Sequence, residues 1–226
     1  MKAVLFDLFG TLVDNPTNEQ VFSLHASIAE VLGVPPEEYA KGWKLTFHDR
    51  ASGLHGSIAK SIAAAAKQCS AIYKEEALEQ AVIIRHEFTK TWLTPRSDAV
   101  STIAELKGRG LKIGLLSNCT AEVPEIWPKI AFAPIIDQPL FSCNEGLRKP
   151  MPEFYERALT RLGVQPAECL YVADGDNGEL KQSKALGIST VMIRNSGQLN
   201  DYRTDPEDDW TGPKIECLSD LLTLIP

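Results

Sequence analysis

Short apolar runs alternate with segments of helical periodicity along much of this chain. Four runs have the length and composition of buried strands: residues 2–8, 111–118, 169–175 and 189–194. Amphipathic segments with helix start or stop signals lie between and after them, at residues 98–110, 152–163, 178–187 and 218–225. A polar stretch at residues 195–213, rich in proline, glycine and aspartate, predicts a loop. Strands separated by helices predict βαβ crossovers, and therefore an α/β fold with a parallel sheet and helices on both faces.

The segment between the first two predicted strands has a different character. From about residue 18 to residue 92 the chain shows helical patterns, including the alanine-rich stretch SIAAAAKQ, and no convincing strand interrupts them. Proline and glycine break these patterns near residues 33–38 and 51–57. A chain of 226 residues fits one large domain, or one domain that carries a smaller insertion.

Composition and charge narrow the class of protein. Hydrophobic residues make up 44% of the chain and charged residues 23%, which is ordinary for a globular protein in water. The net charge of -7 argues against nucleic acid or an anionic membrane surface as the main partner. No apolar run approaches the length of a membrane span, and Asp7 interrupts the first run before it can serve as a signal-peptide core. The scattered cysteines, without CxxC spacing, favour free thiols and a cytoplasmic location. The sequence does not indicate the oligomeric state.

Polar residues stand at the point where the predicted strands end. Asp7 lies near the end of the first run, Ser117 and Asn118 end the second, and Asp174 lies near the end of the third. Ligands of parallel α/β sheets bind beyond the carboxyl ends of the strands. Because those ends lie at one edge of the sheet, we expect these residues to converge on one site.

Four short motifs follow one another in order and span most of the predicted core. They are DLFGT (Asp7 to Thr11), LLSN (Leu115 to Asn118), RKP around Lys149, and ADGDNGE (Ala173 to Glu179). In this order and at these strand ends, the motifs resemble those of the haloacid dehalogenase-like (HAD) hydrolase superfamily. The resemblance implies a Rossmann-like core formed by residues 1–14 and 95–226 and a small all-helical cap domain formed by residues 15–94.

The resemblance also implies that Asp7 is the nucleophile of a hydrolase, and elementary chemistry agrees with that role. A carboxylate is ionised at neutral pH, so it can attack without a general base. Its charge and that of an anionic substrate must be neutralised, and Lys149 supplies a fixed positive charge. Ser117, Thr11 and backbone N–H groups of the loops can hold an anionic group in place, and we expect Asn118 to position the loops.

Asp174 and Glu179 predict a metal site together with Asp7. Three converging carboxylates repel one another and raise one another's pKa values unless a cation lies between them. Mg²⁺ prefers oxygen ligands and suits a site shared with a phosphate group. The resemblance adds the backbone carbonyl of Phe9 as a further ligand. We therefore expect Mg²⁺ as the cofactor and a small, phosphorylated molecule as the substrate.

Phe9 departs from the pattern of the family's phosphatases, which carry a second aspartate at this position. That aspartate protonates the leaving alcohol and then activates water, and help of this kind is typically worth about 10²–10⁴-fold. A phosphatase with Phe9 needs another proton donor, or a good leaving group such as an acyl phosphate. His48, Arg50 and His55 stand near glycines that let a loop bend toward the site. These three residues, with Phe9 and Gly10, are the candidate substrate contacts.

Two other interpretations stay open at the level of sequence. The 2-haloacid dehalogenases of the superfamily typically carry an aromatic residue where this chain has Phe9, because halide leaves without a proton, and Tyr155 matches a further position in them. However, they work without metal, usually have serine at the position of Asp174, and carry a cap arginine roughly where this chain has Glu38. The third interpretation is a catalytically weak module that binds a phosphorylated ligand.

Overall fold

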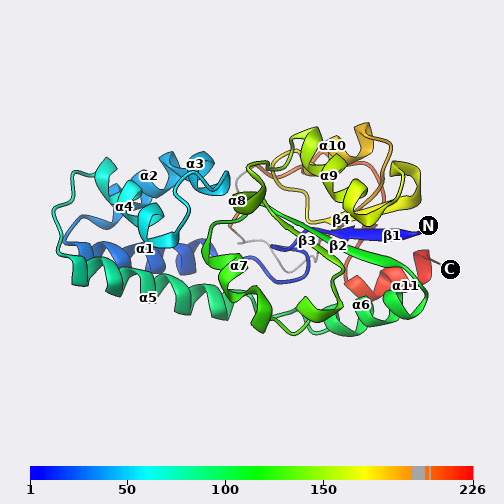
Figure 1. Cartoon of the computed structure of the whole chain (residues 1–226), viewed down its shortest axis with the longest axis horizontal. Helices are drawn as coiled ribbons and strands as arrows, with labels where there is room; N and C mark the ends of the chain where they lie inside the picture. The colour runs from blue at the N-terminus through cyan, green and yellow to red at the C-terminus, as the bar shows by residue number, and fades with distance from the viewer. Residues whose placement is uncertain (195–201, 204, 226) are drawn as a thin grey trace.

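The computed structural model describes residues 1–194, 202–203 and 205–225 of the chain. Within these residues, six strands form one parallel sheet in the order β3-β2-β1-β4-β5-β6 (Figure 1). The strands are β1 (Ala3–Phe6), β2 (Lys112–Ser117), β3 (Gln138–Phe141), β4 (Cys169–Ala173), β5 (Ser189–Ile193) and β6 (Lys214–Ile215). The predicted α/β fold with a parallel sheet is confirmed.

Helices cover both faces of this sheet. Val4 and Phe6 of β1 pack on one face with α6 (Ala99–Gly108) and α11 (Leu221–Leu224). Ala3 and Leu5 point to the other face, where α9 (Pro152–Leu162) and α10 (Glu179–Ala185) pack on them. Figure 1 shows these two helical layers above and below the strands. Successive side chains of a strand point to opposite faces, so a strand buried on both sides needs an apolar run without alternation.

Shorter elements complete the α/β part of the chain. They are α7 (Glu122–Ile126), α8 (Ser142–Glu145) and the 3₁₀ turns η1 (Trp127–Lys129), η2 (Ala133–Ile135), η3 (Pro166–Glu168) and η4 (Leu218–Asp220). The sequence pattern does not predict β3 or β6. β3 lies at an edge of the sheet and contains Pro139, which has no N–H for a second neighbour. β6 has only two residues, too few to form a pattern, and the predicted loop at residues 195–213 lies partly outside the described residues.

Five helices between β1 and α6 pack around a hydrophobic cluster of their own, and we call them the helical unit. They are α1 (Asn18–Leu32), α2 (Pro36–Leu45), α3 (Phe47–Ala51), α4 (Ile58–Gln68) and α5 (Glu75–Trp92). Leu24, Tyr39 and Ile62 are among the buried residues of the cluster, which contains no residue from the α/β part. No helix in the described part of the chain combines the length and apolar character that a membrane crossing requires. The domain boundaries at residues 14/15 and 94/95 stay a prediction.

Two close contacts join the helical unit to the α/β part. The Phe9 ring stacks on Trp92, the last residue of α5, with 4.1 Å between the ring centroids. Gly53, just after α3, has a φ of +73° and lies so near α8 that an added Cβ would come within 1.8 Å of the Cys143 carbonyl oxygen. Only a residue without a side chain allows this approach.

A buried ion pair crosses the same junction. Arg85 of α5 donates from Nε to Oε1 of Glu122 on α7 at 2.8 Å, and both side chains are buried. Burial by itself raises the pKa of Glu122, but the Arg85 charge and the hydrogen bonds to the Glu122 carboxylate together outweigh burial and hold the pKa below its usual value. Each charge is stable in the interior only because the other neutralises it.

We expect Arg85→Met to destabilise the protein by about 3–5 kcal/mol, because the substitution leaves Glu122 as an uncompensated buried charge. Lys90→Met is the matched control on the same helix. Lys90 pairs with Glu87 at an exposed position, where a pair contributes less than about 1 kcal/mol. Denaturant unfolding measures both variants, and similar losses in the two would contradict the importance of the buried pair.

His25 predicts a pH dependence of stability. Burial, reinforced by the charges of Arg85 and Arg50, lowers the pKa of His25 from 6.5 to about 4. Between these two pH values the unfolded chain takes up a proton that the folded chain refuses, so the free energy of unfolding falls as the pH falls through this window. The loss reaches about 3 kcal/mol at its lower end. Urea unfolding at about pH 7 and about pH 4.5 should show a steeper loss in the unmodified protein than in His25→Asn; parallel losses would contradict the prediction.

Candidate active site

The motif residues meet at the carboxyl edge of the sheet, where three neighbouring strands end at the same level. Phe6, the last residue of β1, is in register with Leu115 of β2 and Val172 of β4. The Asp7 N–H donates to the Val172 carbonyl at 2.9 Å, so the pairing of β1 continues up to the residue that bears the carboxylate. This register brings the loops that follow β1, β2 and β4 to one place.

Asp7 is buried, and both of its carboxylate oxygens accept hydrogen bonds. Thr11 Oγ1 donates to Oδ2 at 3.1 Å, and Lys149 Nζ donates to Oδ1. Burial raises the pKa of Asp7 to about 6, although the Lys149 charge opposes that rise. The carboxylate is therefore ionised at neutral pH and fixed in one orientation by its two donors.

Lys149 Nζ lies between two carboxylates. Besides Asp7, it donates to Glu179 Oε2 at 2.6 Å and to the Tyr171 hydroxyl at 3.3 Å. Tyr171 in turn donates to the same Glu179 oxygen at 2.7 Å. Burial lowers the pKa of Lys149, but the two carboxylates outweigh burial and hold the pKa above its usual value. The ammonium group stays charged and ties Asp7 to β4 and α10.

In the second motif, the Asn118 side chain orients Lys149, and the Ser117 hydroxyl is available to bind an anion. Asn118 Nδ2 donates to the Lys149 carbonyl at 3.0 Å, and Asn118 Oδ1 accepts from the Lys149 N–H at 2.8 Å. The Ser117 hydroxyl is buried at the end of β2 and has no hydrogen-bond partner in the described part of the chain. A buried hydroxyl without a partner is unfavourable, so it is well placed to donate to a bound anion.

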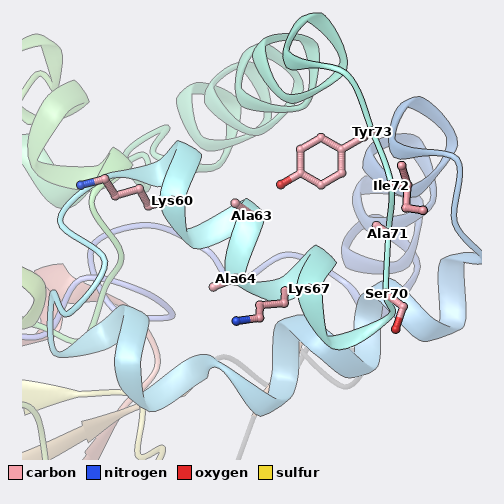
Figure 2. Close-up of a pocket in the computed structure, with 8 residues that line it drawn as sticks. All are labelled: Lys60, Ala63, Ala64, Lys67, Ser70, Ala71, Ile72 and Tyr73. Carbon is pink, nitrogen blue, oxygen red and sulfur yellow. The ribbon is translucent and has the colours of Figure 1, made fainter.

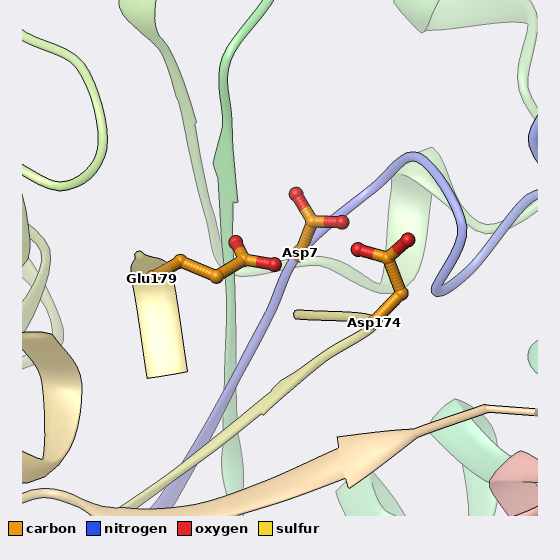
Figure 3. A group of neighbouring side chains, drawn as sticks. All are labelled: Asp7, Asp174 and Glu179. Atoms are coloured by element: carbon orange, nitrogen blue, oxygen red, sulfur yellow. The ribbon is translucent and has the colours of Figure 1, made fainter. Parts of the chain in front are cut away.

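Asp7, Asp174 and Glu179 form an acidic cluster. One carboxylate oxygen from each lies within 4.8 Å of the others, and Figure 3 shows the three side chains turned toward one another. Burial, followed by the charges of Glu179 and Asp7, raises the pKa of Asp174 well above its usual value. Within the described residues, the three carboxylates outnumber the two cations that form ion pairs with them, Lys149 and Arg203. The charge and the oxygen ligands therefore fit a divalent cation.

The loop after Asp7 depends on Gly10. Its φ is +76°, and an added Cβ would lie 2.3 Å from Oδ2 of Asp174, so only glycine allows the loop this close to the acidic cluster. Arg96 fixes the loop from the other side by donating to the Gly10 carbonyl at 2.8 Å. Phe9 turns toward the helical unit and stacks on Trp92, so its ring supports the junction.

The structure does not bring His48, Arg50 or His55 into hydrogen-bonding contact with Asp7 or Lys149 in the part of the chain it describes. His48 is exposed, and the His55 Nε2 is buried without a partner. Arg50 is buried within the helical unit and donates to the Trp43 carbonyl and to Thr46 Oγ1. A role for any of the three in catalysis or substrate contact stays a prediction.

Three side chains that the sequence did not single out contact the carboxylate groups of the acidic cluster. Asn15 Nδ2 donates to Asp174 Oδ2 at 3.0 Å. Arg203 donates to the Asp174 carbonyl at 3.1 Å and forms an ion pair with its carboxylate at 3.3 Å. Tyr171 is the third, through Glu179. A tyrosine within an apolar strand has the pattern of a core residue, and Arg203 belongs to a distant polar segment. Only Asn15, close behind the first motif, carried a usable signal.

A hollow of about 810 Å³ lies elsewhere, in the helical unit. Figure 2 shows the residues that line it, from α4 and the segment that leads into α5: Lys60, Ala63, Ala64, Lys67, Ser70, Ala71, Ile72 and Tyr73. The lining contains no carboxylate and no motif residue. It therefore offers nothing for the chemistry of the acidic cluster.

Comparisons with known proteins agree with the motifs and the fold. The model of the haloacid dehalogenase-like hydrolase family matches residues 1–187. Similar curated proteins include a glyceraldehyde 3-phosphate phosphatase of Methanocaldococcus jannaschii, 26% identical over 98% of this chain and 97% of that protein. Another is (S)-2-haloacid dehalogenase 4A of Burkholderia cepacia, 25% identical over 100% of this chain and 95% of that protein.

A similar fold occurs in the crystal structure of a HAD family enzyme from Bacteroides thetaiotaomicron in complex with magnesium and inorganic phosphate. Its TM-score is 0.68 at 19% identity, with 93% of this chain and 98% of the other covered. The family model covers most of the present chain, including all four motifs. This protein is therefore a hydrolase and belongs to the haloacid dehalogenase-like hydrolase family.

Proposed function

We propose that this protein is a magnesium-dependent phosphatase of a small phosphorylated metabolite and that it acts through an aspartyl phosphate on Asp7. The observation that carries the proposal is the buried acidic cluster, in which the Asp7 carboxylate is clamped by Thr11 and Lys149 while two further carboxylates lie within 4.8 Å. The phosphatase names of several relatives support it. The magnesium and inorganic phosphate bound by an enzyme of similar fold also support the proposal.

In the proposed reaction, a carboxylate oxygen of Asp7 attacks phosphorus, and the bond from phosphorus to the ester oxygen breaks. Thr11 and Lys149 orient the attacking carboxylate, and Lys149 stabilises negative charge on the transferring group. Ser117 donates its unpartnered hydroxyl to a phosphoryl oxygen. Water then attacks the phosphorus of the aspartyl phosphate, which releases inorganic phosphate and restores the Asp7 carboxylate.

Asp7, Asp174 and Glu179 are the residues that would hold Mg²⁺, with the backbone carbonyl of Phe9 as a further ligand. When bound, the cation neutralises the excess charge of the carboxylates and stabilises charge on the phosphoryl oxygens. Glu179 Oε1 accepts from the N–H groups of Gly175 and Asp176, both at 3.2 Å. These contacts, with those of Lys149 and Tyr171 to Oε2, orient the carboxylate before a cation binds.

Phe9 limits the substrates that such an enzyme would hydrolyse rapidly. Its ring cannot protonate the leaving oxygen, so the leaving group must depart as an anion or take a proton from water. The rate then depends steeply on the stability of the leaving anion, which favours acyl phosphates and similar esters over simple alkyl phosphates. The helical unit, anchored to Phe9 through Trp92, acts in this proposal as a cap that excludes water from the transfer.

The second candidate is a 2-haloacid dehalogenase. Phe9 favours it, because halide needs no proton, and a relative of comparable similarity bears that name. The acidic cluster opposes it. Asp174 and Glu179 add negative charge next to Asp7, where a haloacid carboxylate must bind.

We expect p-nitrophenyl phosphate hydrolysis that requires Mg²⁺, stops with EDTA and falls at least about 10³-fold in Asp7→Asn, because the nucleophile is removed. Asp176→Asn is the matched control. Asp176 is the other acid of the last motif, and its side chain accepts from the backbone of Asn177 and Asp205 outside the acidic cluster. Colorimetric phosphate release measures the reaction.

Chloride release from 2-chloropropionate in EDTA would overturn the phosphatase proposal in favour of the dehalogenase. If neither substrate reacts, phosphorylated metabolites that raise the melting temperature of the protein would point to the binding module.

A series of aryl and alkyl phosphates tests the effect of Phe9. We expect kcat/KM to fall steeply as the pKa of the leaving alcohol rises, because the site lacks an acid. Phe9→Asp should flatten this dependence and improve the poorest leaving groups by about 10²-fold relative to p-nitrophenyl phosphate. Phe9→Leu removes the stacking on Trp92 without adding a carboxylate, so it should keep the steep dependence. A shallow dependence in the unmodified protein would mean that another residue already supplies the proton.

A further inference from the structure

Two guanidinium groups lie against one tryptophan inside the helical unit, and among the described residues only one of the two has a carboxylate partner. Arg50 Cζ is 3.6 Å and Arg85 Cζ is 4.8 Å from the centroid of the Trp43 ring. Arg85 pairs with Glu122. Arg50, which is 3% exposed, has no carboxylate at ion-pair distance in the described part of the chain, and it donates only to the Trp43 carbonyl and Thr46 Oγ1.

An unpaired guanidinium in the interior is a costly feature that the fold alone does not explain. Burial, followed by the charge of Arg85, lowers the pKa of Arg50 to about 9, so the group is still charged at neutral pH. Burying an ion without a counter-ion is strongly unfavourable. Because the charges of Arg85 and Glu122 cancel, the positive charge of Arg50 remains beside Trp43.

The neighbours of Arg50 add further polar atoms without partners. Arg50 Nε, His25 Nε2 and the Tyr39 hydroxyl are buried and make no hydrogen bond within the described residues. The rings of His25 and Tyr39 each lie 6.2 Å from the ring of Trp43. We call these four residues, with Arg85, the Trp43 cluster. Several unpartnered polar groups around an excess positive charge are what an anion site without its anion looks like.

The Trp43 cluster lies at the junction that borders the acidic cluster. Trp92 of α5 stacks on Phe9, two residues from Asp7, and Arg85 is seven residues earlier on the same helix, about 10 Å along its axis. Glu122, the partner of Arg85, belongs to α7, which follows Ser117 and Asn118 closely in the chain. Both clusters therefore border the same junction between the helical unit and the α/β part.

We propose that the Trp43 cluster binds a second anionic group of the substrate and that Arg50 is the residue that recognises it. This inference rests on the proposed phosphatase function and names the substrate class: a phosphomonoester whose other end carries a carboxylate or a second phosphate. Arg50 Nε and the Tyr39 hydroxyl donate to the anion. The free oxygen of Glu122, Oε2, accepts from a neighbouring hydroxyl of the substrate.

The test is binding to Asp7→Asn protein with Mg²⁺, measured by calorimetry with pairs of ligands that differ only at the far end. In the first pair, 6-phosphogluconate carries a carboxylate where sorbitol 6-phosphate carries a hydroxymethyl group. In the second, fructose 1,6-bisphosphate carries a phosphate where fructose 6-phosphate carries a hydroxyl. We expect the doubly anionic member of at least one pair to bind at least about tenfold more tightly, the range of a charge-assisted hydrogen bond.

We define the affinity ratio as the affinity for the doubly anionic ligand of a pair divided by that for its partner. Arg50→Gln in the Asp7→Asn protein should bring this ratio close to one. Lys44→Gln is the matched control, because Lys44 is an exposed cation on α2, the helix that carries Trp43, and its loss should leave the ratio intact. Equal binding within both pairs by protein with Arg50 intact would overturn the proposal, whether or not Arg50→Gln folds. So would a loss of the ratio in Lys44→Gln, since the preference would then reflect overall charge.

The two proposals can fail separately. If the unmodified protein hydrolyses no phosphomonoester but the ligand preference depends on Arg50, the phosphatase function fails and the anion site stands. If phosphomonoesters are hydrolysed but both pairs bind equally, the anion site fails and the phosphatase function stands.

Discussion

The burial of three carboxylates at one edge of the sheet is the constraint on which the site depends. Each carboxylate loses its hydration there, which raises the pKa of Asp7 and of Asp174, and the charge of Glu179 adds to both rises. Lys149 offsets part of this cost by contacting two of them, and Thr11 and Tyr171 orient the same two groups. These donors come from segments far apart in the chain, so the charge compensation joins the loops after β1 and β4 to the loop that carries Lys149.

The two buried charged regions of this protein carry excess charge of opposite sign. In the part of the chain that the structure describes, the acidic cluster has three carboxylates and two ion-paired cations, whereas the two guanidinium groups of the Trp43 cluster have one paired carboxylate, Glu122. Neither imbalance is stable by itself in a low-dielectric interior. A cation at the first and an anionic group at the second would remove both, and a substrate that spans the junction would link them.

Phe9 connects packing with chemistry. At this position a carboxylate would serve proton transfer, whereas the ring stacks on Trp92 and fixes the end of α5 against the α/β part. The same helix carries Arg85, whose ion pair with Glu122 closes the junction further along. The residue that removes an acid from the site therefore also anchors the helical unit above it, so the chemistry and the position of the unit are coupled.

The sequence by itself determined the α/β class, four of the six strands and the residues that end them. An apolar run of this length flanked by helix signals is typical of a buried strand, and Asp7, Ser117 and Asp174 stand at or next to the ends of such runs. The sequence did not reveal β3, β6 or the contacts of Tyr171 and Arg203. Two of these are strands too short or too proline-rich to form a pattern, and the other two are contacts between segments far apart in the chain.

Only the tertiary structure decided which charges are compensated. In the sequence Arg50 and Arg85 are equivalent basic residues of a helical segment, and Glu122 is an ordinary acid of a short helix. Folding pairs Arg85 with Glu122 and leaves Arg50 buried against Trp43 with no counter-ion among the described residues. The cost of a buried charge depends on what lies within a few ångströms, and local sequence does not contain that information.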